Sequence, residues 1–155
     1  MAINKPFFVP QKEVDLIDAM NEELIDDIVG QTVDIYKITV EDTETNLYGE
    51  SSTKYYDKGF RVNCLILYNE PEIRQDEFGP DVEGSIEMYF HRTTLKEAGF
   101  YPEIGDIVDW NRHYYEMNTV VEPQLIAGHH GFNHQIKAVA HKIKTSNLQI
   151  EERVK

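Results

Sequence analysis

The feature that most constrains this chain is a series of short apolar segments with a period of two, which begins near residue 31. A period of two places every second side chain on the same face of an extended strand. Between residues 85 and 91, for example, Ile86, Met88 and Phe90 share one face, which predicts a half-buried strand. The pattern predicts six strands, over residues 32–40, 60–68, 85–91, 107–110, 114–122 and 132–144.

The connections between these segments indicate how the strands pair. Asn111, Arg112 and His113 separate the fourth strand from the fifth, and so short a connection predicts a tight hairpin. Short sequential strands joined in this way predict a mainly β domain, either a small antiparallel β-barrel or a sandwich. Residues 41–59 and 69–84 are predicted to be long loops, and loops of that length are usually functional or ordered by a partner.

Residues 12–29 have a helical period instead, and Gly30 stands where a left-handed residue would end a helix. We therefore expect one N-terminal amphipathic helix, with a shorter helical turn over residues 93–98 that stops at Gly99. Acidic residues cover the polar face of the long helix, which is either solvated or matched to a basic partner. The apolar stripe of this helix comprises Val14, Ile17, Met20, Leu24 and Ile28.

The length of 155 residues suits one domain with arms. We expect an N-terminal arm and helix over residues 1–30, a β domain over 31–145 and a C-terminal tail over 146–155. The sequence contains neither a signal-peptide pattern nor an apolar run of about 18 residues, which predicts a soluble protein made in a cytoplasm.

The net charge is −13, from 28 acidic and 15 basic residues. A protein that reads nucleic-acid sequence needs a basic surface to neutralise phosphates, so the charge argues against that class. An acidic surface is compatible with a wall past which DNA slides without sticking.

Residues that could carry chemistry do not form a catalytic motif. His129, His130 and His134 lack the helical spacing of a metal site, which favours exposed loop histidines over a metal site or pH-sensitive interface contacts. Cys64 lies in an apolar run and is predicted to be a small buried hydrophobe. The acidic residues between 76 and 83 lack the alternating register of a calcium loop. No nucleophile, phosphate-binding or dinucleotide motif is present, so we predict no enzyme, no cofactor and no metal.

Aromatic and apolar side chains in the arm and loops are the candidate contacts with partners. An apolar tip is costly to leave in water, and tyrosine combines a large contact area with a polar end. The predicted partner-interface residues are Phe7, Phe8, Leu47, Tyr48, Tyr55, Tyr56, Phe78, His129 and His130.

Several segments resemble one family in the same order, over roughly residues 30–145. The neck proteins of contractile-tailed bacteriophages contain a stretch that resembles Asn46-Leu47-Tyr48-Gly49-Glu50-Ser51 and the following Lys54-Tyr55-Tyr56. Their pattern is also similar to Asp76-Glu77-Phe78-Gly79. The hairpin of head-closure and head-tail connector proteins resembles Pro102-Glu103-Ile104-Gly105-Asp106-Ile107-Val108, with Tyr114-Tyr115-Glu116-Met117 and Val120-Val121 after it.

The resemblance implies a virion structural protein that forms a subunit ring, a hexamer or less favourably a dodecamer, in the phage neck. Such a ring closes the DNA-filled head and joins the portal or adaptor to the tail terminator. It implies assembly in the host cytoplasm, location at the head-tail interface, passage of genomic DNA without sequence-specific binding, and no membrane partner. No catalytic residue carries over from the family. The alternatives are a tail terminator or baseplate adaptor of the same virion and, from the histidines, a metal-binding β-barrel enzyme.

Overall fold

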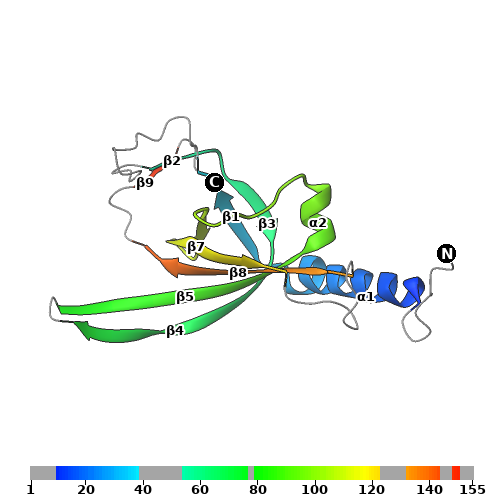
Figure 1. The fold of residues 1–155 in the computed structure, drawn as a ribbon, viewed down its shortest axis with the longest axis horizontal. Helices are drawn as coiled ribbons and strands as arrows, with labels where there is room; N and C mark the ends of the chain where they lie inside the picture. The colour runs from blue at the N-terminus through cyan, green and yellow to red at the C-terminus, as the bar shows by residue number, and fades with distance from the viewer. Residues whose placement is uncertain (1–9, 39–53, 77–78, 123–131, 144–147, 151–155) are drawn as a thin grey trace, which may run out of the picture.

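The computed structural model describes residues 10–38, 54–76, 79–122, 132–143 and 148–150 (Figure 1). Its centre is an antiparallel sheet of seven strands in the order β3-β1-β6-β7-β8-β5-β4. The strands are β1 Thr32–Tyr36, β3 Phe60–Asn63, β4 Leu65–Asp76, β5 Gly79–His91, β6 Ile107–Trp110, β7 His113–Val121 and β8 Gln135–Lys142. Two short strands, β2 Lys54–Tyr56 and β9 Leu148–Ile150, form a separate parallel pair.

The prediction of a mainly β fold with one N-terminal helix is confirmed, but the sheet is not closed into a barrel. The single strand expected over residues 60–68 is divided at Cys64 into β3 and β4, which lie at opposite ends of the sheet. The Cys64 amide donates to the carbonyl of Gln31 at 2.8 Å instead of joining a ladder. Only Cys64 separates β3 from β4, yet these strands form the two edges of the sheet. The sheet must therefore curl around its core to bring the edges close together, although β3 and β4 do not pair.

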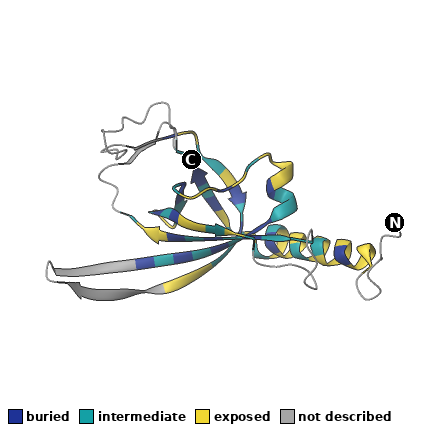
Figure 2. Cartoon of the chain, viewed as in Figure 1, coloured by how far each residue is buried: buried dark blue, intermediate teal, exposed yellow. Residues whose placement is uncertain are grey.

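Small residues at the centre of the sheet let larger neighbours pack over them. Ala138 and Ala140 of β8 are fully buried, opposite Met88 and Ile86 of β5. On the other side of β8, Ala140 also pairs with Met117 of β7. Each large apolar side chain buried in this way contributes about 1.5–3 kcal/mol. Figure 2 shows the resulting buried positions along the strands that surround the core.

The predicted loop over residues 69–84 is wrong, because these residues extend β4 and β5 into a long hairpin. The two strands pair as far as Asp76 and Gly79, with a bulge between Asn69 and Glu72. Pro71 lies within that bulge, where its missing N–H costs no ladder hydrogen bond. Strand β8 pairs with β5 only from Ser85 onward, so the outer hairpin projects from the sheet as a two-stranded arm (Figure 1). The other predicted loop, residues 41–59, lies outside the described residues as far as position 53, and its described part contains the strand β2.

The helix predictions are confirmed. Helix α1 (Gln11–Glu23) continues into a π-helical turn, η1 (Leu24–Val29), and ends at Gly30 with a φ of 55°. The short helix α2 (Arg92–Glu97) follows β5, and Gly99 has a φ of 68°. Helix α1 extends away from the sheet, opposite to the β4–β5 arm (Figure 1). No helix in the described part of the chain is long and apolar enough to cross a membrane.

Candidate assembly interface

A row of large apolar side chains lies exposed along α1 and η1. Leu16, Met20, Leu24 and Ile28 are 60%, 61%, 44% and 70% exposed, and we call these four residues the helix stripe. They recur at intervals of four, which keeps them on one side of a helix. In a π-helical turn each residue rotates less about the helix axis than in an α-helix, so Ile28 stays on the same side of the helix as Leu24. Figure 2 shows this helix as mainly exposed.

A different side of the same helix is packed against the molecule. Val14 and Ile25 are buried, at 7% and 4% exposure, so this side of α1 and η1 is covered. Of the apolar stripe predicted from sequence, only Val14 is therefore buried. A helix with a second, uncovered apolar side marks an interaction site more often than a solvated surface.

Acidic residues border the helix stripe. Residues 11–29 contain seven acidic side chains and one basic side chain, Lys12. Neither α1 nor η1 has a basic residue in its last turn, where the helix dipole favours one. The surface that complements this helix is thus an apolar one with a basic rim. The acidic residues are Glu13, Asp15, Asp18, Glu22, Glu23, Asp26 and Asp27.

A polar network fixes the base of the helix. The His91 imidazole is buried, and its Nε2 lies 3.0 Å from Oδ1 of Asp18. Nδ1 of His91 accepts the Thr94 amide at 3.4 Å, so Nε2 carries the proton and donates to Asp18. Thr93 Oγ1 donates to the second oxygen of Asp18 at 3.0 Å, and Thr94 Oγ1 donates to Asp26 at 3.3 Å. The network therefore links α1 and η1 to the start of α2.

The same network has the composition of a hydroxyl–imidazole–carboxylate relay, because Thr94 Oγ1 lies 3.0 Å from His91 Nδ1. His91 is only 2% exposed, however, and it is the N-cap residue of α2. The imidazole is therefore shielded from solvent, and its hydrogen bonds position the helix.

His134, one of the predicted loop histidines, lies beside this network. Burial lowers the pKa of His134, and the nearby His91 adds to that effect while Asp18 opposes it. Its backbone carbonyl accepts the Arg92 amide at 3.0 Å, which ties the start of β8 to α2. No group of three or more metal-ligating side chains is placed to hold an ion within the described ranges.

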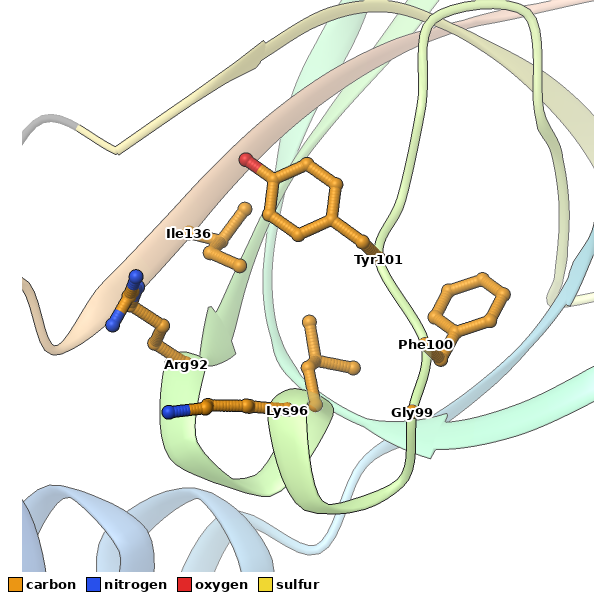
Figure 3. A pocket seen from close by; sticks show the side chains of 7 residues that line it. Arg92, Lys96, Gly99, Phe100, Tyr101 and Ile136 are labelled. Atoms are coloured by element: carbon orange, nitrogen blue, oxygen red, sulfur yellow. The ribbon is translucent and has the colours of Figure 1, made fainter.

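A pocket of about 350 Å³ opens on the side of α2 (Figure 3). We call it the α2 pocket. Its apolar surface comes from the buried residues Leu95 and Ile136 and from Tyr101, which is 46% exposed. In Figure 3 the Arg92 and Lys96 side chains extend from α2 to the same side of the pocket. The full lining is Arg92, Leu95, Lys96, Gly99, Phe100, Tyr101 and Ile136.

The two cations at this pocket differ in their surroundings. Arg92 Nε lies 3.2 Å from Oε2 of Glu122, and that carboxylate also accepts from Asn133 and Tyr101. Hydrogen bonding, chiefly from Asn133, lowers the pKa of Glu122, so Arg92 faces a charged carboxylate. Lys96 is exposed, and it has no ion-pair partner among the described residues.

The Gly105-Asp106 turn, which carries part of the sequence resemblance, is tied to β7. The Gly105 amide donates to the carbonyl of Met117 at 2.8 Å, and the Met117 amide donates to the backbone carbonyl of Asp106 at 2.9 Å. The Asp106 side chain is buried and accepts the Glu103 amide at 2.8 Å. Burial raises the pKa of Asp106, against the opposing effects of that hydrogen bond and of Lys37, whose Nζ lies 3.7 Å away.

Only two of the predicted interface residues fall within the described ranges. Tyr55 lies in β2, paired with Gln149 of β9. Tyr56 is 1% exposed and packs with Tyr36 and Ile107, so its side chain lies inside this chain. The helix stripe is absent from that set of predictions. Its signal in the sequence is that apolar residues fall on more than one side of residues 11–29. The other predicted residues, Phe7, Phe8, Leu47, Tyr48, Phe78, His129 and His130, lie outside the described residues.

Comparison with known proteins gives little overlap. No family model matches the chain, and no curated protein matches it. One similar chain belongs to a solved structure described as the virion of native gene transfer agent (GTA) particle. That match has a TM-score of 0.46 and 12% sequence identity, and it covers 73% of this chain and 94% of the other.

Proposed function

We propose that this chain is a structural subunit of a tailed-phage virion, and that it forms a ring in the neck between portal and tail. The observation that carries the proposal is the helix stripe. A subunit that leaves four large apolar side chains exposed on a projecting helix gains free energy when a partner covers them. This favours an assembly component over a chain that works alone.

The sequence resemblance supplies the class of assembly. The segment around Gly105-Asp106 is the one that resembles the hairpin of head-closure proteins. In the fold it precedes the β6–β7 hairpin, whose Tyr115 and Met117 enter the core. The resemblance therefore involves residues that build the domain, which supports an expectation of shared architecture.

In the proposed ring, the acidic charge of the chain acts on the DNA that passes through. A net charge of −13 per subunit repels phosphates, so DNA passing through the ring stays mobile. The β4–β5 arm and helix α1 extend in opposite directions, which provides each subunit with separate elements for neighbouring proteins (Figure 1).

Mass spectrometry of virions purified from the source organism tests the proposal. We expect the chain in intact particles, and we expect cryo-electron microscopy to locate it between portal and tail as a hexameric or dodecameric ring. Absence from particles would overturn the virion role. A position at the far end of the tail or in the baseplate would overturn the neck role alone.

A further inference from the structure

We propose that the helix stripe of one subunit docks in the α2 pocket of a second copy of this chain. The inference deepens the proposed assembly function and rests on it for the setting in a ring. The contact itself is a property of the purified chain, so it can be tested separately.

The two surfaces match in their apolar character. The stripe offers Leu16, Met20 and Leu24 along one side of a projecting helix, and the pocket offers about 350 Å³ above Leu95 and Ile136. Docking removes both apolar surfaces from water, which is the main favourable contribution to most protein association. Tyr101 at the pocket, 46% exposed, adds an aromatic side chain of the kind enriched at interfaces.

The two surfaces also match in charge. Glu13, Glu23 and Asp27 are exposed beside the stripe, and no ion pair within the described residues involves them. Lys96 is exposed at the pocket, while Arg92 is already opposite Glu122. Lys96 is therefore the cation that meets the acidic border of the stripe. Complementary charge at an interface sets its orientation and suppresses wrong partners.

The contact must join two copies, because a subunit cannot place its stripe in its own pocket. Asp18 and Asp26 face α2 of the same chain, through hydrogen bonds to Thr93 and Thr94. On a helix these aspartates lie on one side of the buried Val14 and Ile25, and the stripe lies on the other side. The stripe consequently faces away from its own α2.

The proposed contact uses different surfaces on the two copies. Each bound pair then retains one free stripe and one free pocket, so further copies add until the rotation closes a ring. A second copy is favoured over another protein because this acidic chain itself carries an apolar pocket with an exposed lysine, Lys96, at its edge.

Cross-linking between single-cysteine variants tests the geometry. Ala19→Cys is mixed with Ala98→Cys and treated with a short bis-maleimide, in solution and in assembled particles. Both alanines are exposed next to the proposed contact, so Met20 and Lys96 stay in place. Cys64 is fully buried, so the unmodified chain gives the background. We expect a cross-linked dimer from the mixture and a ladder of higher oligomers from the chain that carries both substitutions. Ala19→Cys mixed with Arg112→Cys, at an exposed hairpin turn, is the matched control.

Complementation provides a second test that is insensitive to general loss of stability. Lys96→Glu removes the pocket cation but leaves a stripe, and the uncharged substitution Met20→Asn disrupts the stripe but leaves a pocket. Sedimentation velocity should show each variant associating about tenfold more weakly than the unmodified chain. Their mixture should form one dimer and nothing larger, because it contains one working stripe and one working pocket. Lys142→Glu makes the same charge change at an exposed position elsewhere and should leave association unchanged.

The outcomes separate this contact from the proposed function. Absence of the cross-link both in solution and in particles would overturn the contact while leaving the virion role intact. Cross-links from Ala19→Cys to a different virion protein alone would also overturn it. Cross-linked chain in solution that never enters particles would support the contact and overturn the virion role.

Discussion

At the scale of single residues, the turn between β6 and β7 holds two side chains in a disfavoured conformation. Asn111 and Arg112 have φ angles of 50° and 65° between the paired residues Trp110 and His113. A two-residue hairpin turn of this kind needs positive φ at both positions, which asparagine tolerates better than arginine.

Replacing Arg112 by glycine should therefore stabilise the protein by about 1 kcal/mol, because glycine adopts a positive φ without steric cost. Urea unfolding followed by circular dichroism measures the change. Arg112→Ala keeps the strain and serves as the control, with an expected change within about 0.5 kcal/mol. Equal stabilisation by both substitutions would contradict the explanation.

Asp106 predicts a dependence of stability on pH. Burial raises its folded-state pKa above the ordinary value of 3.8, so the folded state binds more protons than the unfolded state between those two values. Its contribution to stability is present below pH 3.8 and is lost as the pH rises through the raised pKa. The free energy of unfolding of wild type and of Asp106→Asn is measured with urea across this pH range. The contributions of the other titratable groups cancel in the difference between the two proteins. We expect the stability of wild type relative to the variant to fall with rising pH, and parallel curves would refute this.

At the scale of elements, the position of α1 depends on one buried polar network. Asp18 is the carboxylate that accepts from both His91 and Thr93. The helix otherwise packs through Val14 and Ile25, which is a small apolar contact for an element of this length. Its orientation, and hence that of the helix stripe, is thus controlled by polar contacts.

Asp18→Ala should destabilise the protein by about 1–3 kcal/mol, because it leaves the buried His91 N–H without an acceptor. Amide hydrogen exchange should also become faster along α1. Glu22→Ala removes an acidic residue from an exposed position of the same helix and should change stability by less than about 0.5 kcal/mol. A similar loss in both variants would show that the network does not anchor the helix.

At the scale of the whole molecule, Cys64 stands where the chain passes from one edge of the sheet to the other. Its thiol is fully buried, and burial raises the pKa of Cys64 to about 12. The thiolate is the reactive form of cysteine. The folded protein therefore limits the reactivity of Cys64 in two ways, because burial keeps reagents out and the raised pKa keeps the thiol protonated.

We expect Cys64 to react with a thiol reagent only when the curled sheet opens. The labelling rate should rise with urea in parallel with unfolding measured by circular dichroism. Met20→Cys adds an exposed thiol and should label at once in native buffer. Fast labelling of Cys64 under native conditions would mean that the chain around Cys64 opens locally without global unfolding.

The period of the apolar residues by itself determined the helix and most of the strands of the sheet, but not the strand pairing over residues 69–84. Alternation at Ile86, Met88 and Phe90 reports a local backbone geometry, as do Gly30 at the end of η1 and Asn111 in the hairpin turn. Such features depend on neighbours in sequence and can therefore be read from it. The candidate interface could be predicted only in part, because Tyr56, expected at a partner contact, is buried against Tyr36 and Ile107.

Only the tertiary structure decided which side of each element is covered. The residues of the helix stripe have the same apolar character as Val14, but one side of the helix is covered in the fold and the other is not. The division of one apolar run at Cys64 and the conversion of residues 69–84 into a hairpin likewise depend on partner strands far away in the chain. Hydrophobicity is a property of each residue, whereas burial depends on where the rest of the chain lies, and that dependence left the helix stripe exposed for a partner.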